Sequence, residues 1–252
     1  MTEDFGALGA AFRKDGFVHV ERFLDPGESQ ELEANLASFI LKIVPTLPKA
    51  EAMYEDYGAP ESLKYIGHLG ITPYFAAFLK NSKVRELAGA LLNEAVIPES
   101  ISFFNKPARR GSPTPPHQDG FYFCLVPNAA LTVWIALDDV DEENGAIHYW
   151  KRSHLGGVLP HNASHVLGFS QGLASNSQAS WGEETVCRVK RGDCLIHHSL
   201  MVHSAGPNPS HRTRRAIGLV YYGESAKTDP EAERRYQESV LEQQKTLLPT
   251  GR

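Results

Sequence analysis

The sequence predicts a mainly β protein with flanking helices, and three observations support that prediction. The chain has 252 residues, of which 42% are hydrophobic and 22% charged, so it is an ordinary globular sequence with room for a large core. Residues 1–99 have mostly helical periodicity. Residues 100–223 contain short β-branched or aromatic runs without intervening helices, which is typical of a sandwich or jelly-roll barrel. We therefore expect one domain over residues 1–252.

The helix-rich N-terminal part, residues 1–99, is expected to hold one strand, over Phe17–Glu21. A helix is predicted to begin at residues 25–28, where the order Asp-Pro-Gly-Glu supplies an N-cap, a proline at the first helical position and a capping-box glutamate. Its apolar positions continue at helical spacing until Pro45. A further helical stretch is predicted over Thr72–Leu92, with a break at Asn81.

The β core, residues 100–223, is expected to contain short strands separated by turns at residues 110–116 and 143–145. The predicted strands are Ile101–Lys106, Phe121–Val126, Leu131–Leu137, Ala146–Trp150, Thr185–Val189, Cys194–His198 and Arg214–Tyr222. Residues 224–252 form a C-terminal tail, in which we expect a surface helix from Lys227 onward and then a frayed end.

The charge balance and the cysteine content exclude several classes of protein. With 25 basic and 30 acidic residues the formal net charge is −5, which argues against partners such as nucleic acid or an anionic membrane. No apolar run is long enough for a membrane span, and the first residues do not look like a secretory signal. Three scattered cysteines favour buried free thiols. We expect a cytoplasmic protein that is a monomer or homodimer.

A His-x-Asp pattern at His117 and Asp119 is the first candidate for metal chemistry. At the end of a strand, residues two apart point to the same face and offer one nitrogen and one oxygen ligand. The pattern is weak alone, because 11 histidines and 30 acidic residues give about one such match by chance. A rival match at His19 and Glu21 lies in an amphipathic strand, and we interpret it as surface or packing.

A third ligand is expected at His203. It ends an apolar strand that a Gly-Asp turn at residues 192–193 begins, and small residues follow it. Two histidines and one carboxylate on one side of a metal are diagnostic of non-haem Fe(II) oxygenases. The mid-strand His197 and His198 are interpreted as core or supporting groups.

The histidines His161 and His165 are a further candidate pair. Their spacing of four residues could bring them together on a helix, but the Ser- and Gly-rich surroundings are typical of a loop. We do not expect this pair to bind a metal.

Three arginines, Arg212, Arg214 and Arg215, begin the last core strand. A charged guanidinium at the start of a buried strand needs an anion, either a ligand carboxylate or a protein Asp or Glu. Alternation places Arg212 and Arg214 on one face and Arg215 on the other. The sequence pattern leaves both sources of the anion open.

Taken together, His-x-Asp, a Gly-Asp turn before a strand ending in histidine, and an arginine 11 residues after His203 resemble the phytanoyl-CoA dioxygenase (PhyH) family. The segments Phe12–Leu24 and Thr132–Gly145 also resemble the family's opening segment and its central strand with an Asn-Gly turn. The turn at Trp150–His154 departs from the family because it lacks Pro-Gly. The resemblance implies an Fe(II)- and 2-oxoglutarate-dependent oxygenase with a double-stranded β-helix core, of the jelly-roll or cupin-like kind.

The resemblance also implies roles for individual residues. His117, Asp119 and His203 would be the catalytic centre that holds Fe(II), and Arg214 would bind the distal carboxylate of 2-oxoglutarate. The other positions that match cosubstrate-binding positions of the family are Asn105 and Trp134, with Thr132 and Ser204 as weaker candidates.

The implied reaction is hydroxylation of an unactivated C–H bond of a small-molecule metabolite by O2, with release of succinate and CO2. Asp119 fills the position that a small residue takes in related halogenases, which favours hydroxylation, or a desaturation or ring-forming variant of it. Two alternatives remain open: a cupin-like metalloenzyme that does not use 2-oxoglutarate, and a metal or metabolite sensor. Aromatic and histidine candidates for the substrate pocket are Tyr65, His68, Tyr74, Phe121, Tyr122 and Phe123.

Overall fold

The computed structural model describes residues 5–166, 169–174 and 181–247, and two antiparallel sheets form its centre. The larger sheet consists, in spatial order, of β1 (Phe17–Val20), β12 (Cys194–His198), β7 (Ala130–Ala136), β14 (Arg214–Gly223), β4 (Val96–Lys106), β3 (Leu63–Ile66) and β2 (Ala52–Tyr54). The smaller sheet consists of β11 (Glu184–Cys187), β8 (Ile147–Trp150), β13 (His203–Ala205) and β5 (Thr114–His117). This is the mainly β, jelly-roll architecture that the sequence predicts.

Six α-helices and two short strand pairs complete the described part of the chain. The helices are α1 (Phe5–Asp15), α2 (Pro26–Lys42), α3 (Pro73–Leu79), α4 (Ser82–Leu92), α5 (Asp119–Phe123) and α6 (Pro230–Leu247). The strand pairs are β9 (His161–Val166) with β10 (Phe169–Leu173), and β6 (Leu125–Val126) with β15 (Lys227–Thr228). Short 3-10 turns lie at Val44–Thr46, Pro60–Ser62, Leu69–Ile71, Glu142–Asn144 and Ser153–Gly156.

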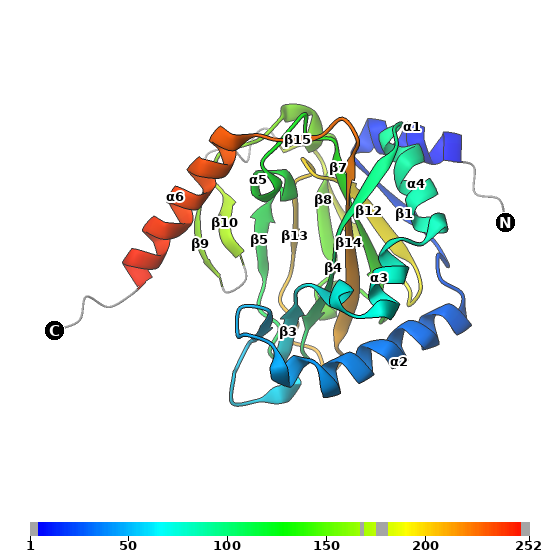
Figure 1. The fold of residues 1–252 in the computed structure, drawn as a ribbon, viewed down its shortest axis with the longest axis vertical. Helices are drawn as coiled ribbons and strands as arrows, with labels where there is room; N and C mark the ends of the chain where they lie inside the picture. Colours follow the sequence, from blue (N-terminus) through cyan, green and yellow to red (C-terminus); the bar gives the residue numbers. More distant parts are fainter. Residues whose placement is uncertain (1–4, 167–168, 175–180, 248–252) are drawn as a thin grey trace.

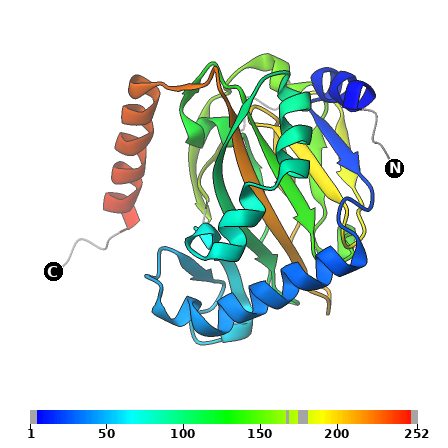
Figure 2. The same ribbon diagram turned by 45° about the vertical axis from the view of Figure 1, so that its right-hand side comes forward.

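The helices α2, α3 and α4 cover the outer face of the larger sheet, and α6 lies on the other side of the molecule beside β9 and β10 (Figure 1). The turned view shows α2 running along one end of that sheet (Figure 2). Within the described ranges, no helix combines the length and the apolar character that crossing a bilayer would need.

Side-chain alternation along β7 separates two layers of core. Leu131, Val133 and Ile135 pack in the cluster that joins the larger sheet to the helices. Trp134 packs instead in the cluster between the two sheets, and Thr132 alternates to the same inner face. The same period divides β14, where Ile217 lies in the outer cluster. The inner faces of these strands are therefore the walls of any site between the sheets.

Several predicted elements are confirmed nearly to the residue. The N-terminus of α2 has the full capping box, because Asp25 accepts a hydrogen bond from the Glu28 backbone N–H at 2.8 Å and Glu28 accepts one from that of Asp25 at 2.9 Å. The helical stretch over 72–92 is broken between α3 and α4 as expected. A helix follows Lys227, while the frayed end predicted beyond it lies outside the described residues. All three cysteines are free and buried.

The predicted strand over Phe121–Val126 is wrong for its first half. Asp119–Phe123 is the short helix α5, and only Leu125 and Val126 are extended. The aromatic run has high strand propensity, but tertiary contacts override it. At Gly120 the chain passes so near its neighbours that an added Cβ would lie 2.6 Å from Asn128 Oδ1, and Phe121 packs edge-on against Tyr236 of α6.

Other differences add strands where we expected none. The N-terminal part holds β2 and β3 besides β1, and both extend the larger sheet. The predicted turn over residues 110–116 ends in strand β5, whose two prolines are tolerated because β5 is the edge of the smaller sheet. The predicted loop around His161 is strand β9, while the side chain of His165 lies outside what the structure describes.

Candidate metal and cosubstrate site

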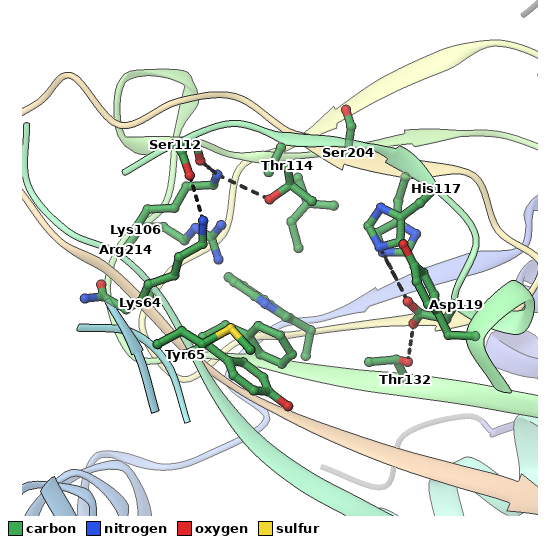
Figure 3. A pocket seen from close by; sticks show the side chains of 18 of the residues that line it. Lys64, Tyr65, Lys106, Ser112, Thr114, His117, Asp119, Thr132, Ser204 and Arg214 are labelled. Carbon is green, nitrogen blue, oxygen red and sulfur yellow. Dashed lines mark hydrogen bonds and ion pairs between the residues drawn. The ribbon is translucent and has the colours of Figure 1, made fainter. Parts of the chain in front are cut away.

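A cavity of about 460 Å³ lies between the inner faces of the two sheets. Its walls come from β4, β7, β12 and β14 on one side and from β5, β8 and β13 on the other, and residues of β2 and β3 also line it. Figure 3 shows its two polar ends, with His117 and Asp119 at one end and Lys64, Lys106 and Arg214 at the other.

His117, Asp119 and His203 come together at one end of the cavity. Their candidate ligand atoms all lie within 4.8 Å of one another. The Nε2 atoms of His117 and His203 lie 3.6 Å and 3.7 Å from Oδ1 of Asp119. His117 ends β5, and His203 faces it directly from the neighbouring strand β13. Two buried nitrogens and one oxygen thus converge as the sequence predicts.

Both histidines present the nitrogen that a metal needs. Nδ1 of His117 lies 2.8 Å from the Pro115 carbonyl oxygen, and Nδ1 of His203 lies 3.0 Å from that of Met201. Because a carbonyl oxygen only accepts, each Nδ1 carries the proton, and each Nε2, which faces the Asp119 carboxylate, is the ring atom that would ligate a cation.

Two hydrogen bonds to Oδ2 orient the carboxylate of Asp119. Its Oδ2 accepts a hydrogen bond from the Thr132 hydroxyl at 2.6 Å and one from His197 Nε2 at 3.1 Å. Nδ1 of His197 in turn accepts a hydrogen bond from the Tyr149 hydroxyl at 2.8 Å. His197 is therefore the supporting group that the sequence suggests, and it leaves Oδ1 directed toward the two imidazoles.

The charge state of the cluster suits a cation. Burial acts to raise the pKa of the Asp119 carboxyl, but the charge and hydrogen bonds of His203, His117 and His197 outweigh it and hold the pKa well below its ordinary value. Burial, followed by the neighbouring imidazoles, holds the pKa of His203 well below its ordinary value. The ionised carboxylate and the neutral imidazole are the forms that ligate metals.

Arg214 lies at the other end of the same cavity with 5% of its surface exposed. Its guanidinium stacks 5.3 Å above the Trp134 ring, and its buried Nε has no hydrogen-bond partner. Burial lowers its pKa to about 10. Arg215 on the opposite face pairs with Asp138 at 2.6 Å, and Arg212 pairs with Asp141 at 2.7 Å. Protein carboxylates therefore form ion pairs with Arg212 and Arg215. Arg214 forms no ion pair with a described carboxylate, so its guanidinium can bind an anionic ligand.

The remaining predicted positions also reach the cavity. Asn105, Thr132, Trp134 and Ser204 line it. The Asn105 amide donates a hydrogen bond to the Leu63 carbonyl at 2.7 Å, while its Oδ1 is buried without a partner.

Of the aromatic and histidine candidates for the substrate pocket, four line the cavity: Tyr65, His68, Tyr122 and Phe123. Polar wall residues that we did not single out include Lys64, Lys106, Ser112 and Thr114. Alternation would have placed Lys106 on the inner face of β4, because Ile101 and Phe103 face the helices.

The competing histidines have other partners. His19 Nε2 lies 2.9 Å from the Asp193 carboxylate, outside the cavity. His161 stacks on Phe121 with ring centres 4.1 Å apart, and its Nε2 accepts a hydrogen bond from the Gln118 backbone.

Sequence comparisons with known proteins agree with this geometry. The model of the phytanoyl-CoA dioxygenase (PhyH) family matches residues 12–216. A phytanoyl-CoA dioxygenase domain-containing protein 1 from Bos taurus is 26% identical over 249 residues, covering 81% of this chain and 85% of the relative. Its Dictyostelium discoideum homologue is 23% identical and covers 84% and 89%.

Solved structures with a similar fold include enzymes described as dependent on 2-oxoglutarate. The epimerase SnoN, in a complex described as containing Fe3+, alpha ketoglutarate and nogalamycin RO, is 25% identical with a TM-score of 0.73, covering 98% of this chain and 91% of SnoN. The carbocyclase SnoK from nogalamycin biosynthesis is 25% identical with a TM-score of 0.71, covering 89% and 86%. EvdO2 from Micromonospora carbonacea, complexed with 2-oxoglutarate, is 25% identical with a TM-score of 0.69, covering 89% and 92%.

The family model spans both the His-x-Asp pattern and Arg214. The fold is also similar to that of SnoN over 98% of the chain. The chain therefore belongs to the phytanoyl-CoA dioxygenase (PhyH) family and is a non-haem Fe(II)- and 2-oxoglutarate-dependent oxygenase.

Proposed function

We propose that this oxygenase hydroxylates a C–H bond of a small-molecule metabolite, with conversion of 2-oxoglutarate and O2 to succinate and CO2. In this proposal His117, Asp119 and His203 hold Fe(II), and Arg214 binds the distal carboxylate of 2-oxoglutarate. The observation that carries it is the buried guanidinium of Arg214, whose Nε has no hydrogen-bond partner, in the same cavity as the three-ligand cluster.

The donor set fits ferrous iron. Two imidazoles and one carboxylate match a metal of intermediate hardness, and three ligands from one side leave positions for a chelating cosubstrate and O2. When bound, iron with 2-oxoglutarate and O2 supplies the oxidising chemistry that no side chain provides.

The opposite end fits a dicarboxylate. A planar guanidinium binds a carboxylate through two parallel hydrogen bonds, and Arg214 has no protein anion among the described residues to compete for them. Trp134 supports the guanidinium from below. We infer that Trp134 and Asn105 shape the cosubstrate space between the two ends.

Apolar side chains make up much of the cavity wall. Phe104, Tyr122, Phe123 and Ile147 line it together with Trp134. Tyr122 is fixed by a hydrogen bond from its hydroxyl to the Gln171 carbonyl oxygen. A cavity of about 460 Å³ that also holds 2-oxoglutarate favours a compact substrate over an acyl-CoA thioester.

Related folds support several oxidative outcomes, because SnoN is described as an epimerase and SnoK as a carbocyclase. Family membership therefore leaves the reaction on the substrate open, and the carboxylate of Asp119 in the ligand set favours hydroxylation, or a desaturation or ring-forming variant of it, over halogenation. The alternatives without 2-oxoglutarate give no role to the unpaired Arg214.

An anaerobic titration with Fe(II) and 2-oxoglutarate tests this proposal. Wild-type protein is expected to develop the visible metal-to-ligand charge-transfer band of the chelate, and His117→Ala is expected to lose it. Arg214→Ala should raise the 2-oxoglutarate Kd about 10- to 100-fold, because it removes a charge-assisted pair. Arg188→Ala, at an exposed arginine bound to Glu142, is the matched control and should behave as wild type.

Iron binding without the band would contradict the assigned cosubstrate site, and a full band in His117→Ala would contradict the ligand set. Succinate release screened over candidate metabolites, followed by mass analysis of the product, then distinguishes hydroxylation from ring formation or epimerisation.

A further inference from the structure

A second cation, Lys106, stands directly opposite Arg214. The two residues are register partners on the antiparallel strands β4 and β14, and both side chains line the cavity. Directly opposed residues share one face of a sheet with their Cβ atoms about 5 Å apart, and like charges in such a pair are destabilising. Lys106 is 4% exposed and Arg214 is 5% exposed, so water does little to screen the pair.

The described protein offers little negative charge here. The Lys106 Nζ donates hydrogen bonds to the Ser112 carbonyl oxygen and, at 3.3 Å, to the Thr114 hydroxyl. Glu55 is the anion that acts on Lys106, but it lies 3.3 Å from the Lys64 ammonium and accepts from Ser112. No described carboxylate comes within ion-pair distance of Lys106 or Arg214.

Packing holds Lys106 in this position. Its aliphatic stem lies so close to the turn after β7 that an added Cβ on Gly145 would be 2.6 Å from its Cδ. The side chain therefore has little freedom to swing its charge into solvent.

We propose that Lys106 is a second recognition residue for the distal carboxylate of 2-oxoglutarate and that it takes up one proton from solvent when this carboxylate binds. The inference rests on the proposed function of Arg214. The carboxylate has two oxygens, each able to accept from both cations. The proton comes from the buffer and converts the Lys106 amine to an ammonium, and no bond in 2-oxoglutarate changes.

The electrostatics of the ligand-free cavity agree with this assignment. Burial, together with the charges of Arg214 and Lys64, lowers the pKa of Lys106 to about 6, and Glu55 acts in the opposite direction. Arginine stays charged at all ordinary pH values, so the lysine is the member of the pair that gives up its proton. A bound carboxylate reverses this balance because it places a negative charge beside the ammonium.

Titration calorimetry of 2-oxoglutarate into the Mn(II)-loaded protein tests the inference. At about pH 7.5, measurements in phosphate and in Tris, which differ in ionisation enthalpy, count the protons exchanged. We expect uptake of close to one proton per 2-oxoglutarate, and a Kd that rises about tenfold per pH unit between about pH 7 and pH 8.5.

Two variants locate the proton. Lys106→Met and Lys106→Gln should bind 2-oxoglutarate about tenfold more weakly at pH 6.5, without proton uptake and with a Kd independent of pH. Lys80→Met, which removes an exposed lysine, should retain the wild-type proton count. A residue that only supported the loop at 112–114 would change stability and leave the proton count unaltered.

Binding without proton uptake in the wild type would overturn the inference while leaving the role of Arg214 intact, and this result needs no variant to fold. Unchanged uptake in both Lys106 variants would overturn it as well. Absence of 2-oxoglutarate binding to the metal-loaded wild type would overturn both the inference and the proposed function.

Discussion

Asp119 has two oxygens with separate tasks. Oδ1 faces the imidazoles of His117 and His203, and Oδ2 is occupied by the hydroxyl of Thr132 and the ring of His197. Two hydrogen bonds fix the rotation of the carboxylate before any metal arrives. A ligand oriented in advance loses less entropy on binding, so these supporting residues should matter for affinity.

Replacing Thr132 with valine tests whether the hydrogen bond to Asp119 contributes to metal affinity. Thr132→Val keeps the shape and deletes the 2.6 Å hydrogen bond to Asp119, and we expect the Kd for Mn(II) to rise about 10- to 100-fold. Competition titration followed by electron paramagnetic resonance measures it. Thr213→Val, which removes an exposed hydroxyl bound to Asp138, is the matched control. An unchanged Kd would show that His197 alone orients the carboxylate.

Individual site residues differ in how well the sequence predicts them. His117, Asp119, His203 and Arg214 were predicted because their order and spacing resemble those of the PhyH family, and the structure brings them into one cavity. The role of Lys106 depends on which strand lies beside β4, and nothing local in the sequence identifies β14 as that neighbour.

At the scale of elements, local chemistry decides where α2 begins. The reciprocal hydrogen bonds of Asp25 and Glu28 satisfy backbone groups that the first turn would otherwise leave without partners. The buried face of α2 then packs against the larger sheet through Leu32, Leu36 and Phe39.

Asp25→Ala should therefore lower the free energy of unfolding by about 1 kcal/mol without changing the affinity for metal or 2-oxoglutarate. Urea unfolding followed by circular dichroism measures the loss. Asp25→Asn retains a capping oxygen and should lose much less. Equal losses in the two variants would indicate that the charge of Asp25, rather than its cap, stabilises the helix.

Elements near the site were the hardest to predict. The run Phe121–Phe123 has strand-forming side chains, yet Asp119 must turn back toward the imidazoles, and α5 forms because the chain bends there. The prolines of β5 suggested a turn, whereas the sheet accepts them at its edge. Local propensity fails at both places because distant partners fix the backbone.

At the scale of the whole molecule, the buried Lys106 couples stability to pH. Its pKa is about 6 in the folded protein and about 10.4 in an unfolded chain, so the unfolded state binds one more proton between these values. Unfolding then takes up a proton, and the free energy of unfolding rises with pH through this window by up to about 1.4 kcal/mol per pH unit.

Metal-free wild-type protein should therefore gain about 2–3 kcal/mol relative to Lys106→Met between about pH 6.5 and pH 8.5. Urea unfolding of both proteins at each pH measures this difference, and other titrating groups cancel in the comparison. Parallel pH profiles for the two proteins would show that Lys106 is charged in the folded state.

The sequence by itself determined the mainly β class, the caps and breaks of the N-terminal helices, and the four residues at the two ends of the cavity. The fold class and the helix boundaries follow from periodicity and capping, which are local, and the four site residues follow from the resemblance of their order and spacing to the PhyH family. Tertiary structure alone decided which strands are neighbours, and so set Lys106 against Arg214 and Thr132 and His197 behind Asp119. Such pairings depend on the register between strands that are far apart in sequence. The charge of a side chain then depends on its burial and its neighbours, which exist only in the folded protein.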